Sequence, residues 1–177
     1  MVNLLENFFS RNPEIVAKKI LGCILIRNLK NKELKTKIVE TEAYFDEKDP
    51  ASWARFGKRK DNEAMWMNAG TILVKNVHKH KMLNFVTEKK GKASAVLIRA
   101  LEPLNFKKRC NGPGLLTKAL KIGKEFNGKN IFKIKELKLI DNKEKTKIVK
   151  AYRIGVVKDL KKKLRFYIKD NKYVSRK

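Results

Sequence analysis

A chain of 177 residues, 42% of them hydrophobic, has the size of one ordinary domain and can bury a core without disulfides or metal ions. Its 44 basic residues against 18 acidic ones give a net charge of +26, which predicts a polyanionic partner, most often nucleic acid. Cys23 and Cys110 are too few for a disulfide framework or a zinc site, and no apolar run approaches the roughly 20 residues of a membrane helix. We therefore expect a cytoplasmic protein without a metal, a cofactor or a membrane segment.

The first predicted element is a helix from residue 13 to residue 22. Asn12 can cap it, Pro13 is favoured at the first helical position, and Glu14 suits the positive end of the helix dipole. Apolar residues one turn apart give this helix a face that can pack on a core.

A β-hairpin follows, with strands at residues 24–29 and 34–44. The second strand ends in Glu40, Glu42 and Tyr44, which alternation places on one face together with Ile38. Two carboxylates side by side on a strand need cations, hydrogen bonds or a chemical task. Spacing alone favours the plainer interpretation, in which both carboxylates form salt bridges with neighbouring lysines.

The middle of the chain alternates short helical segments with a second hairpin. Helical segments are expected at residues 51–54 and 62–67, on either side of a basic loop. Strands at 71–74 and 82–86 predict a hairpin whose basic tip spans 75–81. Charge alone leaves two interpretations of this tip equally open, a solvated turn or a contact with a polyanion.

A strand predicted at residues 93–101 is apolar almost throughout, and Arg99 is the one charged residue inside it. A guanidinium in a protein interior is tolerated when it pairs with a carboxylate. Glu40 and Glu42, on another buried strand, are therefore its expected partners.

Gly112, Pro113 and Gly114 lead into a helix predicted over residues 115–122. Such an entrance exposes backbone N–H groups that can bind an anion, although most turns of this composition bind nothing.

From residue 127 onward the pattern is rich in β-strands, with candidates at 131–140, 148–156 and 164–168. No repeat or linker divides the chain. We therefore predict one α+β domain over residues 1–177, a mostly antiparallel, curved β-sheet with short helices packed around it.

Seven short blocks of the sequence follow a recognisable order. They are 38–44 (Ile-Val-Glu-Thr-Glu-Ala-Tyr), 49–52 (Asp-Pro-Ala-Ser), 95–103 (Ala-Val-Leu-Ile-Arg-Ala-Leu-Glu-Pro), 112–117 (Gly-Pro-Gly-Leu-Leu-Thr), 153–155 (Arg-Ile-Gly), 164–167 (Leu-Arg-Phe-Tyr) and 174–175 (Val-Ser). In this order and spacing they resemble the alkyladenine (3-methyladenine) DNA glycosylase family.

The resemblance implies a monomeric, nucleoid-associated enzyme that flips a damaged purine out of duplex DNA and hydrolyses its glycosidic bond without metal or cofactor. It implies that Glu42 is the general base that activates water and that Arg99 is its companion. A carboxylate in this place deprotonates water and stabilises the cationic, oxocarbenium-like sugar of the transition state. Because alkylated purines are positively charged and leave readily, a strong general acid is less necessary, and no lysine nucleophile is needed.

Two further residues match the family's base-binding pocket, and a third departs from it. Tyr44 corresponds to a tyrosine that stacks on the flipped base, and Asn84 to an asparagine that helps to exclude normal guanine. Trp53 replaces a histidine found in many members, which keeps an aromatic plate but removes a hydrogen-bond acceptor.

The hairpin departs from the family pattern. Where members carry Tyr-Val-Tyr, two apolar residues and Tyr-Gly, this chain has Leu-Val-Lys-Asn-Val-His-Lys at 73–79, one residue shorter before Asn84. His78 and Lys79 are the candidates to fill the space left by the flipped base, and Gly112 and Gly114 are expected to contact DNA. With fewer aromatic plates, positively charged lesions should be better substrates than neutral hypoxanthine.

Two other interpretations compete with a repair enzyme. One is a protein of the same fold that binds damaged DNA or structured RNA with little or no catalysis, which the altered hairpin would explain. The other is a basic ribosomal or RNA-packaging protein, which predicts equal affinity for RNA and undamaged duplex DNA.

Overall fold

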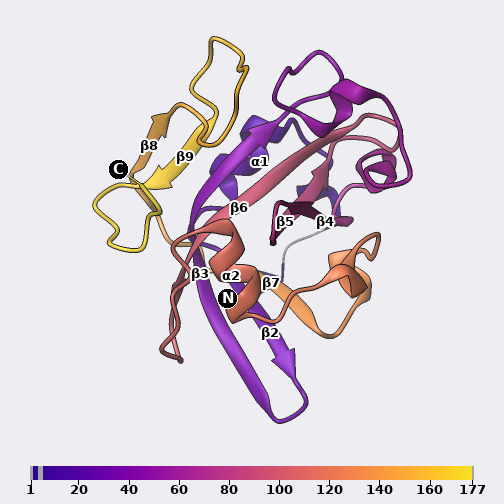
Figure 1. Ribbon diagram of the computed structural model, residues 1–177. Coiled ribbons are helices and arrows are strands. Elements are labelled where there is room, and N and C mark those ends of the chain that lie inside the picture. Colours follow the sequence, from indigo (N-terminus) through magenta and orange to yellow (C-terminus); the bar gives the residue numbers. More distant parts are fainter. Residues whose placement is uncertain (1, 4–5, 177) are drawn as a thin grey trace.

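The computed structural model describes residues 2–3 and 6–176 and is built around one antiparallel sheet (Figure 1). Its path is β1-β7-β2-β3-β6-β5-β4, while β9 also pairs with β3, and β8 with β9. The strands are β1 (Val2–Asn3), β2 (Ile24–Leu29), β3 (Lys32–Tyr44), β4 (Ile72–Val77), β5 (His80–Thr87), β6 (Ser94–Pro103), β7 (Leu137–Asp141), β8 (Ile148–Ala151) and β9 (Arg165–Ile168). The predicted α+β class with a mostly antiparallel sheet is confirmed.

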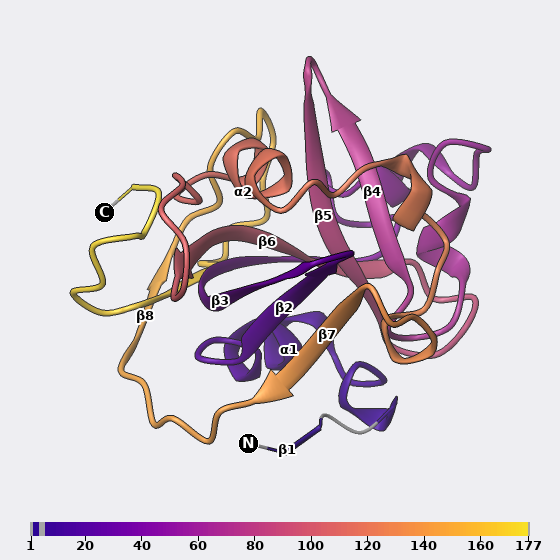
Figure 2. The same ribbon diagram turned by 90° about the horizontal axis from the view of Figure 1, so that it is seen from below.

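Two α-helices lie on opposite sides of this sheet, as Figure 2 shows. α1 (Pro13–Lys19) packs against β3 and β6, and α2 (Pro113–Ala119) against β5 and β6. No helix in the described part of the chain is long and apolar enough to cross a membrane. The described residues also form the short 3₁₀ helices η1 (Glu6–Phe8), η2 (Trp53–Phe56), η3 (Glu63–Trp66), η4 (Lys124–Phe126) and η5 (Ile131–Lys133).

The start of α1 is set by the predicted cap. The Asn12 side chain accepts a hydrogen bond from the Glu14 N–H at 2.9 Å, and Pro13 occupies the first helical position. The helix ends at Lys19, three residues before the predicted end at Gly22. Gly22 lies in the turn that leads into β2, with a φ of 85° that favours glycine.

β3 lies in the middle of the strand order and pairs with three other strands. One edge pairs with β2 over residues 32–37 and then with β9 over 40–42, and the other pairs with β6. The register against β6 shifts between Ile38 and Thr41. Ile38 lies with Ala43 in the main hydrophobic core, so the predicted alternation of faces holds from Glu40 onward and does not extend back to Ile38.

The second hairpin is longer than predicted. β4 extends to Val77 and β5 begins at His80, so the turn is only His78 and Lys79 and not the whole of 75–81. His78 has a φ of 52°, which is typical of a tight two-residue hairpin turn. The polar residues at 75–76 and 80–81 therefore belong to the paired part of β4 and β5. Backbone pairing does not require apolar side chains.

Other elements also begin or end at residues that differ from the prediction. β6 continues to Pro103, whose missing N–H costs nothing at a strand end. α2 begins at Pro113 and ends at Ala119, earlier than the predicted 115–122. The predicted strand at 131–140 is η5 followed by β7, and the one at 148–156 ends at Ala151.

A buried ion pair joins the chain after β8 to the chain after β3. The Arg153 guanidinium donates to both carboxylate oxygens of Asp49 at 2.7 Å each and to the Ala43 carbonyl at 3.0 Å. Burial alone would raise the pKa of Asp49, but the hydrogen bonds from Arg153 and from two backbone N–H groups hold it below its usual value. This pair fixes residues 153–155 beside the end of β3.

We expect Asp49→Asn to lower the free energy of unfolding by about 3–5 kcal/mol at pH 7, because it leaves the buried Arg153 charge without its bidentate partner. In the wild type the contribution of this carboxylate is complete above the unfolded-state pKa of about 3.9 and is lost as the pH falls through the lower folded-state value. Urea denaturation at several pH values measures both effects. Glu47→Gln, at an exposed position nearby, is the control, and an equal change in both variants would contradict the prediction.

Candidate active site

The register of the sheet places five side chains in one row across five strands. Arg165 on β9 pairs with Glu42 on β3, Glu42 with Leu97 on β6, Leu97 with Asn84 on β5, and Asn84 with Leu73 on β4. Directly opposed residues point to the same face of a sheet. Residues far apart in the sequence therefore share one surface.

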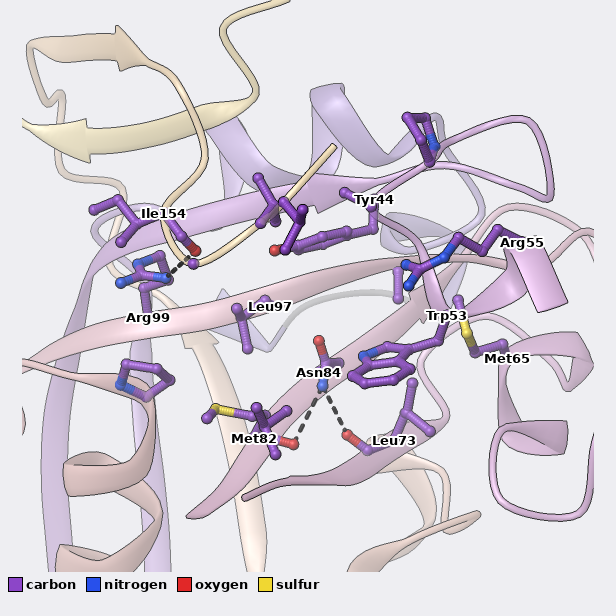
Figure 3. Close-up of a pocket in the computed structure, with 18 of the residues that line it drawn as sticks. Tyr44, Trp53, Arg55, Met65, Leu73, Met82, Asn84, Leu97, Arg99 and Ile154 are labelled. Atoms are coloured by element: carbon purple, nitrogen blue, oxygen red, sulfur yellow. Dashed lines mark hydrogen bonds between the residues drawn. The ribbon is translucent and has the colours of Figure 1, made fainter. Parts of the chain in front are cut away.

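A cavity of about 940 Å³ lies over this row. Figure 3 shows Tyr44 on one side of it and Trp53, Asn84 and Met82 on the other. Its volume lies within the range of small-molecule sites. The lining also includes Arg55, Met65, Leu73, Leu97, Arg99 and residues 154–158.

Glu42 is completely buried, and its three partners, Tyr44, Arg99 and Ile154, line the cavity. Its Oε1 accepts a hydrogen bond from the Ile154 N–H and its Oε2 one from the Tyr44 hydroxyl, both at 2.8 Å. Arg99 Nη1 lies 3.3 Å from Oε1. The carboxylate is thus held in one orientation by three separate parts of the chain.

Burial raises the pKa of the Glu42 carboxyl above its ordinary value, and the nearby Glu40 charge acts in the same direction. Arg99, the Ile154 N–H and the Tyr44 hydroxyl oppose this effect because they stabilise the charged form. Burial and the adjacent Glu42 carboxylate raise the pKa of Tyr44 well above its usual value, so this hydroxyl stays protonated and remains a donor.

Glu40 and Glu42 share a cluster of buried charges whose cations are arginines and not the lysines that spacing favours. Glu40 Oε1 lies 2.9 Å from Arg165 Nη1 and 3.3 Å from Arg99 Nε. The other oxygen of Glu40 accepts the Ser175 N–H at 2.7 Å. The predicted pairing of Arg99 with both carboxylates is confirmed, and the cluster is electrically balanced.

The Tyr44 ring is supported from behind by a second guanidinium. The centre of the Arg153 guanidinium lies 4.6 Å from the ring centroid, a cation–π contact that adds to its pairing with Asp49. This places the ring as one wall of the cavity (Figure 3).

Trp53 provides a second aromatic wall. Lys75 Nζ lies 4.7 Å from the centroid of its ring and pairs with the Asp61 carboxylate. η2 and η3 pack through Ala54, Ala64 and Met65 on a separate small core. Trp53 is therefore held by its neighbours and does not depend on a ligand for its position.

Asn84 presents its side-chain oxygen to the cavity. Its amide nitrogen donates to the Leu73 and Met82 carbonyl oxygens, both at 3.2 Å, which fixes the orientation of the side chain. The oxygen points toward the space between Tyr44 and Trp53 (Figure 3). Asn84 can therefore accept a hydrogen bond from a bound base.

The residues expected to contact DNA lie outside the cavity. His78 and Lys79 form the exposed turn of the β4–β5 hairpin, and Gly112 and Gly114 flank the start of α2. A Cβ on Gly114 would lie only 2.8 Å from the His80 ring, so the close approach of hairpin and helix requires glycine here. Lys79, His80 and Gly114 line a smaller cleft of about 430 Å³.

Four residues of the site carry no role in the sequence-based prediction, namely Arg153, Ile154, Arg165 and Ser175. Each lies in one of the short blocks at 153–155, 164–167 and 174–175. These blocks were the available signal, but the sequence could not assign a partner to any of them. Among residues 2–3 and 6–176, no group of three or more His, Cys, Asp and Glu side chains is arranged to hold a metal ion.

Comparison with known proteins finds a family and relatives for this chain. Residues 7–172 match the family described as methylpurine-DNA glycosylase (MPG). The chain is 38% identical to a protein of Clostridium perfringens (strain 13 / Type A) over 97% of this chain and 98% of the relative. It is 41% identical to one of Borrelia garinii subsp. bavariensis, covering 96% and 97%, and 36% identical to one of Aeropyrum pernix, covering 97% and 92%.

All three relatives carry the name "Putative 3-methyladenine DNA glycosylase". The family match covers most of the chain, and its length agrees with that of these relatives. The chain therefore belongs to the methylpurine-DNA glycosylase family.

Proposed function

We propose that this protein removes alkylated purines such as 3-methyladenine from duplex DNA as a monomeric, monofunctional glycosylase, with Glu42 activating the water. The observation that carries the proposal is a fully buried, tightly oriented carboxylate whose hydrogen-bond partners line an aromatic-walled cavity. All of these groups come from one chain. Such an enzyme acts where the chromosome lies, so we place it in the cytoplasm with the nucleoid.

The aromatic walls suit a purine that has left the base stack. Tyr44 and Trp53 face each other across the cavity, so a flipped base can stack between them (Figure 3). An electron-poor, positively charged base gains further from the electron-rich ring faces. The Asn84 side chain is fixed by its hydrogen bonds to Leu73 and Met82 at the wall of this space, which supports a role in selecting among bound bases.

The chemistry follows from where positive charge develops. As the glycosidic bond breaks, the purine takes the bonding electron pair and the sugar becomes oxocarbenium-like. A Glu42 carboxylate beside the sugar stabilises this cation and accepts a proton from the attacking water, whose oxygen bonds to the anomeric carbon. Because Glu42 has no exposed surface in the free protein, water has to be admitted when the bound nucleotide opens the contact with Tyr44 or Ile154.

Arg99 supports this role by favouring the ionised form of Glu42. Its guanidinium opposes the effect of burial on the Glu42 pKa, and its contact with Glu40 holds it in place. The product is a free base and an intact DNA strand with an abasic site. No step requires an amine nucleophile.

We expect Glu42→Gln to lower the rate of 3-methyladenine release by about 10²- to 10⁴-fold, the usual contribution of a general base. Base release and duplex binding are measured together for each protein. If the enzyme is monofunctional, the product strand should break only after alkali treatment. Glu102→Gln is the control because it changes a partly exposed acid near the end of β6. Tight binding of alkylated DNA without release by the wild type would instead indicate a damage-binding protein.

The pH profile tests the link between Arg99 and Glu42. Burial raises the pKa of Glu42 and Arg99 lowers it, so Arg99→Gln should raise this pKa further. The acid limb of kcat/KM is then expected to move to higher pH, because less of the base is ionised at neutral pH. Arg55→Gln, which removes another charge from the cavity wall, should leave the limb in place. Equal shifts in both variants would reject the specific role of Arg99.

Substrate choice follows from the leaving group. Hypoxanthine is neutral and leaves less readily than 3-methyladenine or 7-methylguanine. We expect it to be excised more slowly from otherwise identical duplexes in single-turnover assays. Equal rates would contradict this expectation, because the pocket would then also have to activate a neutral leaving group.

A further inference from the structure

A buried lysine lies against one of the two aromatic walls of the cavity. Lys75 is only 8% exposed, and its Nζ lies 4.7 Å from the centroid of the Trp53 ring. Its one acidic partner among the described residues is Asp61, whose side chain is 68% exposed. Solvent screens the Asp61 charge more strongly than that of the buried ammonium. The Trp53 ring therefore lies next to a positive charge that is only partly balanced.

Two consecutive residues hold this arrangement in place. Lys75 Nζ pairs with the Asp61 carboxylate and also donates to the Asp61 backbone carbonyl at 3.3 Å. Asn62 is buried, and its side-chain amide donates to the Trp53 carbonyl oxygen at 3.0 Å. The same short segment thus fixes both the ammonium and the residue that carries the indole. A lysine that served only solubility would extend its ammonium into water.

The cation at the other aromatic wall is better balanced. Arg153, beside the Tyr44 ring, pairs with two carboxylates, those of Asp49 and Asp159. Lys75 has a single carboxylate partner among the described residues, and that partner is exposed. The wall against which Lys75 lies therefore has the more positive potential of the two.

This potential acts on the charge that moves in the proposed reaction. When the glycosidic bond breaks, its electron pair passes to the base, so a methylated purine cation becomes neutral and a neutral purine becomes anionic. A base stacked on Trp53 would lie within roughly 10 Å of the Lys75 ammonium, which is about one Debye length at 0.1 M salt. A cation at this distance destabilises a bound cationic base and stabilises the electron pair that the departing base receives.

We propose that Lys75 promotes departure of the base, because its ammonium makes the Trp53 side of the cavity positive and favours transfer of the bonding electron pair onto the base. The proposal rests on the proposed function, since it needs a base bound between the two rings. Lys75 acts here by its charge and neither donates a proton nor attacks the sugar. It has two opposite effects. It weakens the binding of cationic lesions, and it speeds the cleavage of cationic and neutral ones alike.

The rate of base release tests the second effect. Lys75→Met keeps an apolar stem and removes the charge. In single-turnover assays at saturating protein, we expect this variant to release 7-methylguanine and hypoxanthine from duplexes about five- to tenfold more slowly than the wild type. Lys75→Arg keeps the charge and should stay within about twofold of the wild type. Lys124→Met, which removes an exposed lysine from the small cleft that Lys75 also lines, should change neither rate.

Binding separates this electrostatic role from support of the Trp53 ring. In Glu42→Gln protein, which should release base slowly, adding Lys75→Met is expected to tighten binding of a 7-methylguanine duplex about threefold relative to a hypoxanthine duplex. Asp61→Asn leaves the ammonium less balanced and should shift the same ratio in the opposite direction. If the wild type releases no base, the proposed function fails, and the binding ratio still shows whether Lys75 selects against cationic bases.

Two results would overturn this role of Lys75. One is an equal weakening of binding for both lesions in Lys75→Met, which would make the lysine a support for the ring only. The other is a binding ratio that stays the same in both Lys75→Met and Asp61→Asn, which would show that the charge at Trp53 does not reach the bound base.

Discussion

The site depends on burying four charged side chains where β6, β3 and β9 meet. Glu40, Glu42, Arg99 and Arg165 would each be costly in the protein interior if left without a partner. Together they balance, because each carboxylate lies beside a guanidinium and each also accepts a backbone N–H. The arrangement requires β9 to lie beside β3, so the fold and the site are set by the same contacts.

The two acids of this cluster have different contacts. Glu40 contacts both arginines and the backbone of Ser175. Glu42 contacts Tyr44, Ile154 and Arg99, all of which line the cavity. Glu40 thus holds Arg99 in place, and Glu42, whose three partners all line the cavity, is the acid that we propose acts on the substrate.

A second set of contacts connects the carboxylate, the aromatic wall and the loop between Arg153 and Asp159. Arg153 lies against the Tyr44 ring, pairs with Asp49 and closes the loop with Asp159. The next residue, Ile154, binds Glu42. The side chains that would do the chemistry and stack the base therefore share one set of contacts, which suits a reaction that needs precise placement of the substrate.

The sequence by itself determined the elements whose signals are local. The Asn12 cap and Pro13 set the start of α1, and the alternation in β3 placed Glu40, Glu42 and Tyr44 on one face. The ordered blocks identified the family, and a lone charge in an apolar strand correctly predicted that Arg99 pairs with both acids. These signals lie within one turn or one strand, where spacing dictates geometry.

Only the tertiary structure decided which distant segments complete the site. Ile154 lies 112 residues from Glu42 and Ser175 lies 135 residues from Glu40, and no local pattern specifies such pairings. The register shift in β3, the two-residue hairpin turn and the burial of Lys75 beside Trp53 likewise depend on how distant segments meet. Backbone pairing and burial are properties of the assembled sheet, so residue types alone could indicate the chemistry but not the surroundings that make it possible.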